Sequence, residues 1–221
     1  MADPVVLDLP FTGTWRVENS PARRVPSHGT HLFATTYAID FVAVEEGRSA
    51  VVRDWRTALT TEPPERFHAF DRPVLAPAGG TVVEVHDGEP DHEARRSQPA
   101  LLGYALTQAA RARGGPAALA GNHVVLALDG GQGFVLLAHL RRGSVAVRPG
   151  ERVAPGDQVG HCGNSGNSTQ PHVHLQVMDG ADGETARGVP LVFRAYRVRR
   201  GRHVVMVPVG VPGERDVVEP G

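Results

Sequence analysis

The chain has 221 residues, with 23 basic and 24 acidic side chains, 11 histidines and a formal net charge of −1 at pH 7. One cysteine and no lysine exclude an internal disulfide, a cysteine-pair zinc site, Schiff-base chemistry and a lysine-attached cofactor. The near-neutral charge argues against charge-driven nucleic-acid binding, and the 41% apolar content predicts a soluble globular fold.

No targeting signal is visible in the sequence. Residues 1–10 contain two aspartates and neither a positively charged segment nor a long apolar one. No run approaches the roughly 18 apolar residues of a membrane helix. As written, the sequence predicts a cytoplasmic chain without a membrane span, and export is the alternative if the N-terminus has been trimmed.

Proline and glycine divide the chain into short valine-rich segments, which are typical of strands. Turn-forming pairs such as Asp87-Gly88 separate these segments. The pattern predicts a mainly β, single-domain fold over residues 1–221, built as an antiparallel sheet or sandwich. The predicted strands are Tyr37–Val44, Gly80–His86, His123–Leu128, Phe134–His139, Val145–Val147, His172–Val177, Leu191–Ala195 and His203–Val207.

Two segments depart from the strand pattern and are predicted to be inserts in a core of about residues 27–195. The first insert covers about residues 46–72 and the second about residues 88–120. Within the second, Ala100–Arg113 has apolar residues at helical spacing, and Gly114-Gly115-Pro116 is expected to end that helix. One short helical insertion is therefore predicted.

A histidine pair lies in Pro171-His172-Val173-His174. Residues two apart in a strand share a face, so His172 and His174 should project side by side, about 6–7 Å apart. Two such imidazoles can bind one metal together, or one can bind it while the other transfers protons. Taken alone, the motif fits equally an exposed strand face with two surface histidines.

Candidate partners for this pair lie earlier in the chain. Asp40 is flanked by apolar residues, where an ionised carboxylate is costly unless it is paired or bound to a metal. His28 and His31 lie just upstream of it. His139 ends an apolar strand, where it is either a functional group or a core histidine bonded to the backbone. Two histidines, one aspartate and a water fit a catalytic zinc site.

Several motifs together resemble the lysostaphin-like (LytM-type) zinc metallopeptidases, known as peptidoglycan endopeptidases. The resemblance runs from about Ser27 to Val177, interrupted by the two inserts. The matching segments are His28-Gly29 with Asp40, Pro73–Val82, Gly121–Val124, Ala138-His139-Leu140, Gly143–Val153 and Gly156–Thr169 leading into Pro171–His174.

The resemblance implies a β-rich, duplicated hybrid-motif fold whose groove holds Zn²⁺. It assigns His28, Asp40 and His174 as zinc ligands and His139 and His172 as catalytic histidines. The spacing departs from the family pattern, because eleven residues separate His28 from Asp40 where three are usual. His31 is therefore the alternative first ligand, and we prefer His28 because a glycine follows it.

The mechanism implied is metal-assisted amide hydrolysis of peptidoglycan cross-links or similar small-residue peptides. Zinc would polarise the carbonyl and lower the pKa of its bound water. One of His139 and His172 would take the proton of that water, and the other would stabilise the oxyanion or protonate the leaving amine.

Three other interpretations compete with this one. A non-catalytic binding or regulatory protein of the same type should lack part of the ligand set, which this chain retains. A cytosolic peptidase with a non-wall substrate fits the missing export signal. Segments such as Ala76–Val82 also resemble lipoyl-carrier strands, but the chain has no lysine for the attachment. The sequence leaves the oligomeric state open.

Overall fold

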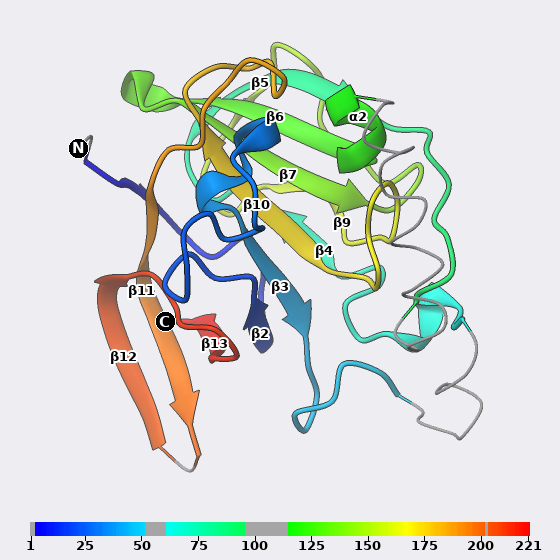
Figure 1. The fold of residues 1–221 in the computed structure, drawn as a ribbon, viewed down its shortest axis with the longest axis vertical. Coiled ribbons are helices and arrows are strands. Elements are labelled where there is room, and N and C mark those ends of the chain that lie inside the picture. The colour runs from blue at the N-terminus through cyan, green and yellow to red at the C-terminus, as the bar shows by residue number, and fades with distance from the viewer. Residues whose placement is uncertain (1–2, 52–60, 96–114, 202) are drawn as a thin grey trace.

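A computed structural model describes residues 3–51, 61–95, 115–201 and 203–221. Figure 1 shows strands from distant parts of the sequence lying side by side across the molecule. Eleven strands form one sheet in the order β1-β11-β13-β2-β3-β10-β7-β6-β5-β8, with β12 paired to β11. The central strands β3, β10 and β7 are far apart in the sequence, so residues from three distant segments meet at the middle of this sheet.

The strands are short, as the spacing of proline and glycine predicts. The first half contributes β1 (Val5–Leu7), β2 (Trp15–Glu18), β3 (Ile39–Ala43), β4 (Pro73–Leu75), β5 (Gly80–His86) and β6 (Asn122–Leu128). The second half contributes β7 (Phe134–Leu140), β8 (Arg152–Val153), β9 (Gln158–His161), β10 (Val173–Met178), β11 (Leu191–Arg200), β12 (His203–Gly210) and β13 (Val217–Pro220).

The described helices are all short. The 3-10 segments are η1 (Leu32–Tyr37), η3 (Pro64–Arg66) and η4 (Asp129–Gly131), and the α-helix is α2 (Gly115–Ala120). None of the described helices is long and apolar enough to cross a membrane.

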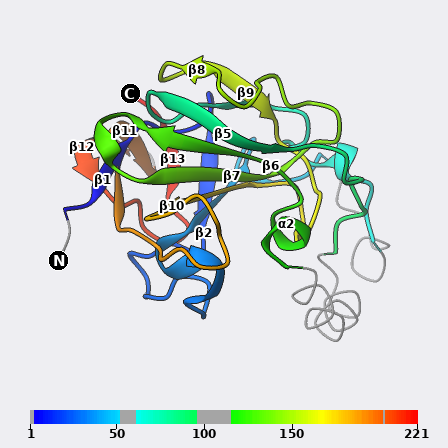
Figure 2. The ribbon, with the colours of Figure 1, turned by 90° about the horizontal axis from the view of Figure 1, so that it is seen from above.

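The mainly β class is confirmed, and the pairing within the large sheet is mixed. All its ladders are antiparallel except one, because β1 runs parallel to β11. A second, two-stranded sheet consists of β4 and β9. Figure 2 shows β8 and β9 together on one side of the molecule, with α2 on the other.

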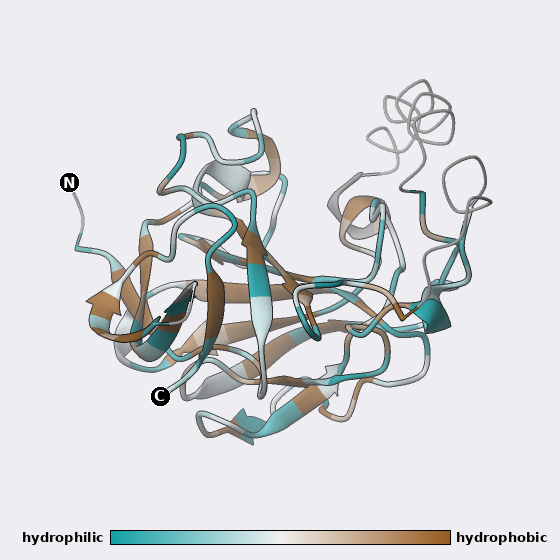
Figure 3. Cartoon of the chain, turned by 90° about the horizontal axis from the view of Figure 1, so that it is seen from below, coloured by the Kyte–Doolittle hydropathy of each residue, from teal (hydrophilic) through white to brown (hydrophobic). Residues whose placement is uncertain are grey.

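Among the described residues, the core consists of one large cluster of buried apolar side chains and two small ones. Phe11 stacks on Trp15 with ring centroids 4.5 Å apart, and Phe41 contacts both Phe11 and Phe193 edge-on. In Figure 3 the hydrophobic colouring follows the strands, and the hydrophilic colouring is concentrated in the connections. Tight packing in this core restricts the movement of β3 and β10. The side chains on the face of these strands that points away from the core are therefore held in fixed relative positions.

Several boundaries differ from the sequence prediction. Residues 145–147 do not form a strand, although Ala146 donates a hydrogen bond to the Val159 carbonyl at 3.0 Å. Tyr37 ends η1 where a strand was predicted to begin. Both have the composition of strand residues, but neither belongs to a described strand.

The predicted helix Ala100–Arg113 lies outside the described residues. Where that helix ends also stays a prediction, and Gly115 and Pro116 of the predicted terminator lie within α2. Proline is accepted in the first turn of a helix, where its missing N–H has no partner in any case.

The strand β12 lies at the end of the large sheet. Among the described strands it pairs only with β11, and their hairpin projects from the rest of the molecule in Figure 1. Its exposed apolar side chains are Val204, Val205, Met206 and Val209.

Candidate metal and catalytic centre

The β3–β10 ladder brings Asp40 directly opposite His174. The two residues are Cα partners, and Nδ1 of His174 lies 2.8 Å from Oδ1 of Asp40. Asp40 belongs to a strand whose neighbour Phe41 lies in the aromatic core, so alternation turns the carboxylate to the other face. Asp40 is 6% exposed and His174 8% exposed, which makes this a largely buried polar pair.

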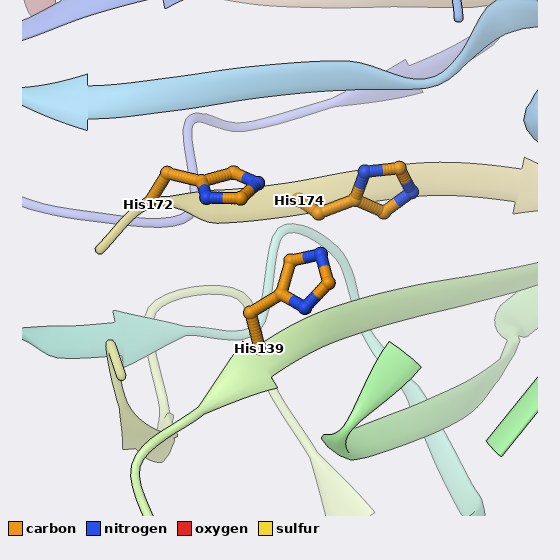
Figure 4. A group of neighbouring side chains, drawn as sticks. All are labelled: His139, His172 and His174. Carbon is orange, nitrogen blue, oxygen red and sulfur yellow. The ribbon is translucent and has the colours of Figure 1, made fainter. Parts of the chain in front are cut away.

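His172 lies immediately before β10 and joins this face, as its spacing from His174 predicts. Its Nε2 lies 3.6 Å from Oδ1 of Asp40. Figure 4 shows His172 at the start of β10 and His174 within it, with His139 directed toward them from the neighbouring strand β7. The ring centroid of His139 is 4.7 Å from that of His172 and 5.7 Å from that of His174.

A β-bulge directs His139 into this group. The β6–β7 register changes between Asn122 and Val124, so that Ala138 and His139 together face the single residue His123. His139 also has a left-handed backbone with φ of 61°, a conformation that costs a non-glycine residue about 1–2 kcal/mol. Bulges re-aim side chains in this way, and the strict alternation of a regular strand would turn His139 to the other face.

His28, rather than His31, lies against Asp40. Its Nε2 is 3.1 Å from Oδ2 of Asp40, and its ring contacts that of His174 edge-on at 5.0 Å. His31 is exposed and its Nδ1 lies 3.0 Å from the Thr36 hydroxyl. Most of the segment between His28 and Asp40 is coiled into η1. The two side chains therefore meet although eleven residues separate them in the sequence.

The carboxylate of Asp40 remains ionised despite its burial. Burial alone would raise its pKa, but the neighbouring His28 and His172, with hydrogen bonds from His174 and His28, hold the pKa of Asp40 well below its usual range. Asn19 adds a hydrogen bond from Nδ2 to Oδ2 at 2.7 Å. The surroundings therefore favour the ionised form of this carboxylate among the imidazoles.

Asn19 was missed at the sequence level. It lies 21 positions before Asp40 in a region with no motif of its own, and its left-handed φ of 52° is common for asparagine in turns. The sequence contains no pattern that links Asn19 to Asp40, because their contact depends on how the chain folds.

The hydrogen bonds of His28 and His174 fix which ring nitrogen faces Asp40. The Ser27 hydroxyl donates to the Thr35 carbonyl at 3.2 Å, so it accepts the Nδ1–H of His28 at 3.0 Å. Gln176 donates its amide N–H to the Phe33 carbonyl at 2.9 Å, which turns its amide oxygen toward Nε2 of His174 at 3.0 Å. Nε2 of His28 and Nδ1 of His174 are thus the nitrogens that face the carboxylate.

His139 and His172 each donate Nδ1–H to a backbone carbonyl. The acceptor for His139 is Ser165 at 3.0 Å, and the acceptor for His172 is Gln170 at 2.8 Å. Neutral imidazole has one donor and one acceptor nitrogen. When neutral, each ring therefore has its lone pair on Nε2, which suits proton transfer.

The pKa values of two histidines are shifted in opposite directions. Burial lowers the pKa of His139 well below 6.5, and the nearby His172 and His174 lower it further. Burial also disfavours charge on His174, but its hydrogen bond to Asp40, the charge of Asp40 and the bond to Gln176 together raise its pKa above 6.5. Such opposed shifts are common where protons are transferred.

The Ser165 carbonyl that orients His139 is itself held by a buried network. Asn122 donates its backbone N–H to the Ser165 hydroxyl, and that hydroxyl donates to the Leu140 carbonyl. Gly121 has φ of +63°, and a Cβ there would lie 2.5–2.6 Å from Ser165 and Gly166 atoms. Only glycine permits this close approach.

The acidic loop after β5 has a structural role in this network. Asp87 accepts the backbone N–H of Gly143, and Asp91 accepts those of Arg142 and Asn164. These bonds hold the chain that follows β7 and the segment that carries Ser165.

The donor atoms converge closely enough for a metal. Among the described residues, His28, Asp40 and His174 form one group, and His139, His172 and His174 form another, each with donor atoms within 4.8 Å of one another. The first group contains the buried anion and two imidazole nitrogens with fixed orientation. Both the N₂O set and the three-histidine set consist of ligand types that bind Zn²⁺ in proteins.

Comparison with known proteins gives one family match. Residues 105–186 match the model of Peptidase family M23. This segment is less than half of the chain; it includes His139, His172 and His174, whereas His28 and Asp40 lie before it.

Three solved structures are similar at low identity. The catalytic domain of lysostaphin from Staphylococcus simulans is 20% identical, over 69% of this chain and 74% of its own, with a TM-score of 0.39. A putative glycyl-glycine endopeptidase lytM from Ruminococcus gnavus is 16% identical, over 85% and 55%, with a TM-score of 0.40. A zinc containing peptidase from Vibrio cholerae is 17% identical, over 68% and 48%, with a TM-score of 0.33.

Proposed function

We propose that this M23-type peptidase cleaves peptide bonds at a zinc ion held by His28, Asp40 and His174. The observation that carries the proposal is the ionised, buried Asp40 carboxylate between Nε2 of His28 and Nδ1 of His174. A buried charge needs a compensating partner, and the orientation of both rings directs ligand nitrogens at the same carboxylate.

Zinc bound there would supply a positive charge that polarises the scissile carbonyl and acidifies the attacking water. The residues of the chain would supply the rest of the chemistry. Nε2 of either His139 or His172 accepts the water proton, since Nδ1 of each ring is engaged by a carbonyl. The other ring stabilises the developing negative charge or protonates the leaving amine.

The proposed substrate is a peptide of small residues, such as a glycine- or alanine-rich peptidoglycan cross-link. The LytM-type motifs of the sequence support this choice, with the family match over His139, His172 and His174. The intact set of five site residues favours catalysis over a purely regulatory role.

The test combines metal analysis with peptide cleavage. Purified protein should contain about one zinc per chain and should cleave a pentaglycine peptide or purified cell-wall material, with product amines detected by mass spectrometry. Asp40→Asn should lose both zinc and cleavage. A chain that holds zinc and cleaves none of a panel of wall and non-wall peptides would instead support the regulatory alternative.

A further inference from the structure

The two candidate histidine ligands are oriented by the same short segment. Ser27, which accepts from Nδ1 of His28, donates to the carbonyl of Thr35. Gln176, which accepts from Nε2 of His174, donates to the carbonyl of Phe33. Phe33 and Thr35 both belong to η1, the segment that accounts for the long spacing between His28 and Asp40.

We propose that Gln176 and Ser27 are positioning residues for the metal, and that η1 aligns both of them through the carbonyls of Phe33 and Thr35. The proposal rests on the proposed zinc site and adds the means by which each ring presents the correct nitrogen. Without these partners, each imidazole could exchange its protonated and unprotonated nitrogens, and only one of the two arrangements binds the metal. Partners that fix a ligand tautomer are characteristic of protein metal sites.

Gln176 suits this role because the orientation of its side-chain amide is fixed by its surroundings. The side chain is 2% exposed, so water does not compete for its amide. If the amide were rotated by half a turn, its oxygen would face the Phe33 carbonyl and its N–H₂ group would face the Nε2–H of His174. Both contacts would be repulsive, so the Phe33 carbonyl determines which atom His174 meets.

The backbone of η1 is strained in the region that supplies one of these carbonyls. Phe33 and Ala34 have φ of 56° and 58°, the left-handed region that side chains other than glycine rarely occupy. Ala34 is fully buried and packs with Val125 and Met178, which holds the segment in place. Backbone strain of this kind persists where the surrounding structure enforces it, as at ligand-binding segments.

The matched variants are Gln176→Leu, Ser27→Ala and Thr36→Val, each measured for zinc affinity by competition with a chromogenic chelator. Loss of an orienting partner typically weakens metal binding by about 10–100-fold, which we expect for the first two variants. Thr36→Val removes a hydroxyl from the same segment, one that contacts the ring of His31, so it should bind zinc as the unaltered protein does.

Gln176→Glu tests orientation separately from packing. A protonated carboxyl reproduces both contacts, because its O–H donates to the Phe33 carbonyl while its other oxygen accepts the Nε2–H of His174. This variant should therefore recover part of the affinity lost in Gln176→Leu. It also keeps the experiment decisive if the leucine variant fails to fold. Equal loss in both variants would show that Gln176 acts only by filling space, and would overturn the positioning role.

Nitrogen-15 NMR of the ring nitrogens gives a readout independent of catalysis. In zinc-loaded protein, His174 should show a single tautomer with the proton on Nε2, and Gln176→Leu should show a mixture or a loss of that signal. Unchanged affinity and an unchanged tautomer in a folded Gln176→Leu variant would contradict this inference alone. Failure of the unaltered protein to bind zinc would contradict the proposed function itself.

Discussion

Asp40 and His174 are Cα partners across the β3–β10 ladder, and the hydrogen bond between their side chains is 2.8 Å long. Because the ladder fixes both backbones, the two donor atoms need no rearrangement to share a ligand. The relationship connects a strand near the N-terminus to one 134 positions later, so the proposed metal site should depend on the large sheet as a whole.

The ligand assignment predicts a sharp contrast between two nearby histidines. His28→Ala and His174→Ala should each reduce bound zinc from about one per chain to nearly none. His31→Ala should retain it, because His31 faces Thr36 and lies in solvent. Elemental analysis of the dialysed proteins checks this. Full zinc content in the His28→Ala protein, with loss in His31→Ala, would reverse the assignment.

Replacing His139 or His172, the proposed proton-transfer residues, should lower activity and leave the metal content unchanged. His139→Gln and His172→Gln should each lower kcat/KM by about 10²–10⁴-fold, because each removes a free Nε2 lone pair. Zinc content should stay near that of the unaltered protein, since neither ring is among the proposed ligands. Loss of zinc in either variant would show that the metal lies in the three-histidine group instead.

Zinc affinity should fall as the pH is lowered. The pKa of metal-free His174 is raised above 6.5, so a proton occupies this ring to a higher pH than usual and must leave before the metal binds. Affinity should therefore rise with pH until His174 is deprotonated, by up to about tenfold per unit for each proton displaced. Asp40 contributes little to this slope, because its pKa is held well below its usual range.

Isothermal titration with zinc at a series of pH values, in buffers of different ionisation enthalpy, measures both the affinity and the protons released. An affinity that stays constant between about pH 5.5 and 8, the range that spans the ordinary histidine pKa, would contradict protonation of the ligand set. His31→Ala provides a control, because it removes an exposed imidazole and should leave the slope unchanged.

The raised pKa of His174 affects the stability of the metal-free protein in the opposite direction. Zinc affinity should rise with pH, whereas the stability that His174 contributes should fall. A raised folded-state pKa for His174 stabilises the fold below pH 6.5, and this contribution is lost as the pH rises through the folded-state value. Urea unfolding of chelator-treated protein should show that His174→Gln loses more stability at about pH 6 than at about pH 9.

Gly121→Ala should damage catalysis through the backbone. The added Cβ would lie 2.5–2.6 Å from Ser165 and Gly166 at a left-handed φ, which should destabilise the fold by about 1–3 kcal/mol. The displaced Ser165 carbonyl would release Nδ1 of His139, so kcat should fall more than KM rises. Gly143→Ala controls for the strain of a left-handed residue alone, because a Cβ added there would meet nothing within 4 Å.

Much of the fold and candidate site could be predicted from local pattern. The segment Gly80–His86 is a strand with the predicted bounds, because its alternation and flanking turns are local properties. The meeting of Asp40 with the His172–His174 pair was anticipated from the costs of burying a carboxylate and from strand periodicity. The roles of these residues remain predictions.

The features that could not be predicted from the sequence depend on how distant strands pair with one another. The bulge that turns His139 inward arises from the mismatch of β6 with β7, which no single strand encodes. The strands β1 and β13 are short and pair with β11 from opposite ends of the chain. Gln176 resembles an ordinary polar residue of a strand until its amide is seen between Phe33 and His174.

The single cysteine should be chemically silent in the native protein. Cys162 is fully buried, and burial together with the nearby Asp91 raises the pKa of its thiol. Because the thiolate is the reactive form, a chromogenic disulfide reagent should detect no free thiol in the folded protein and one per chain in denaturant. Rapid labelling under native conditions would show that this part of the core opens.

The β11–β12 hairpin has a practical consequence for handling the protein. The outer edge of β12 pairs with no other described strand, and the strand carries four exposed apolar side chains. Free apolar edges promote strand-to-strand association, and Pro208 interrupts the edge at one position only. Concentrated solutions should thus become turbid by self-association through this hairpin, and Val205→Lys should keep them clear.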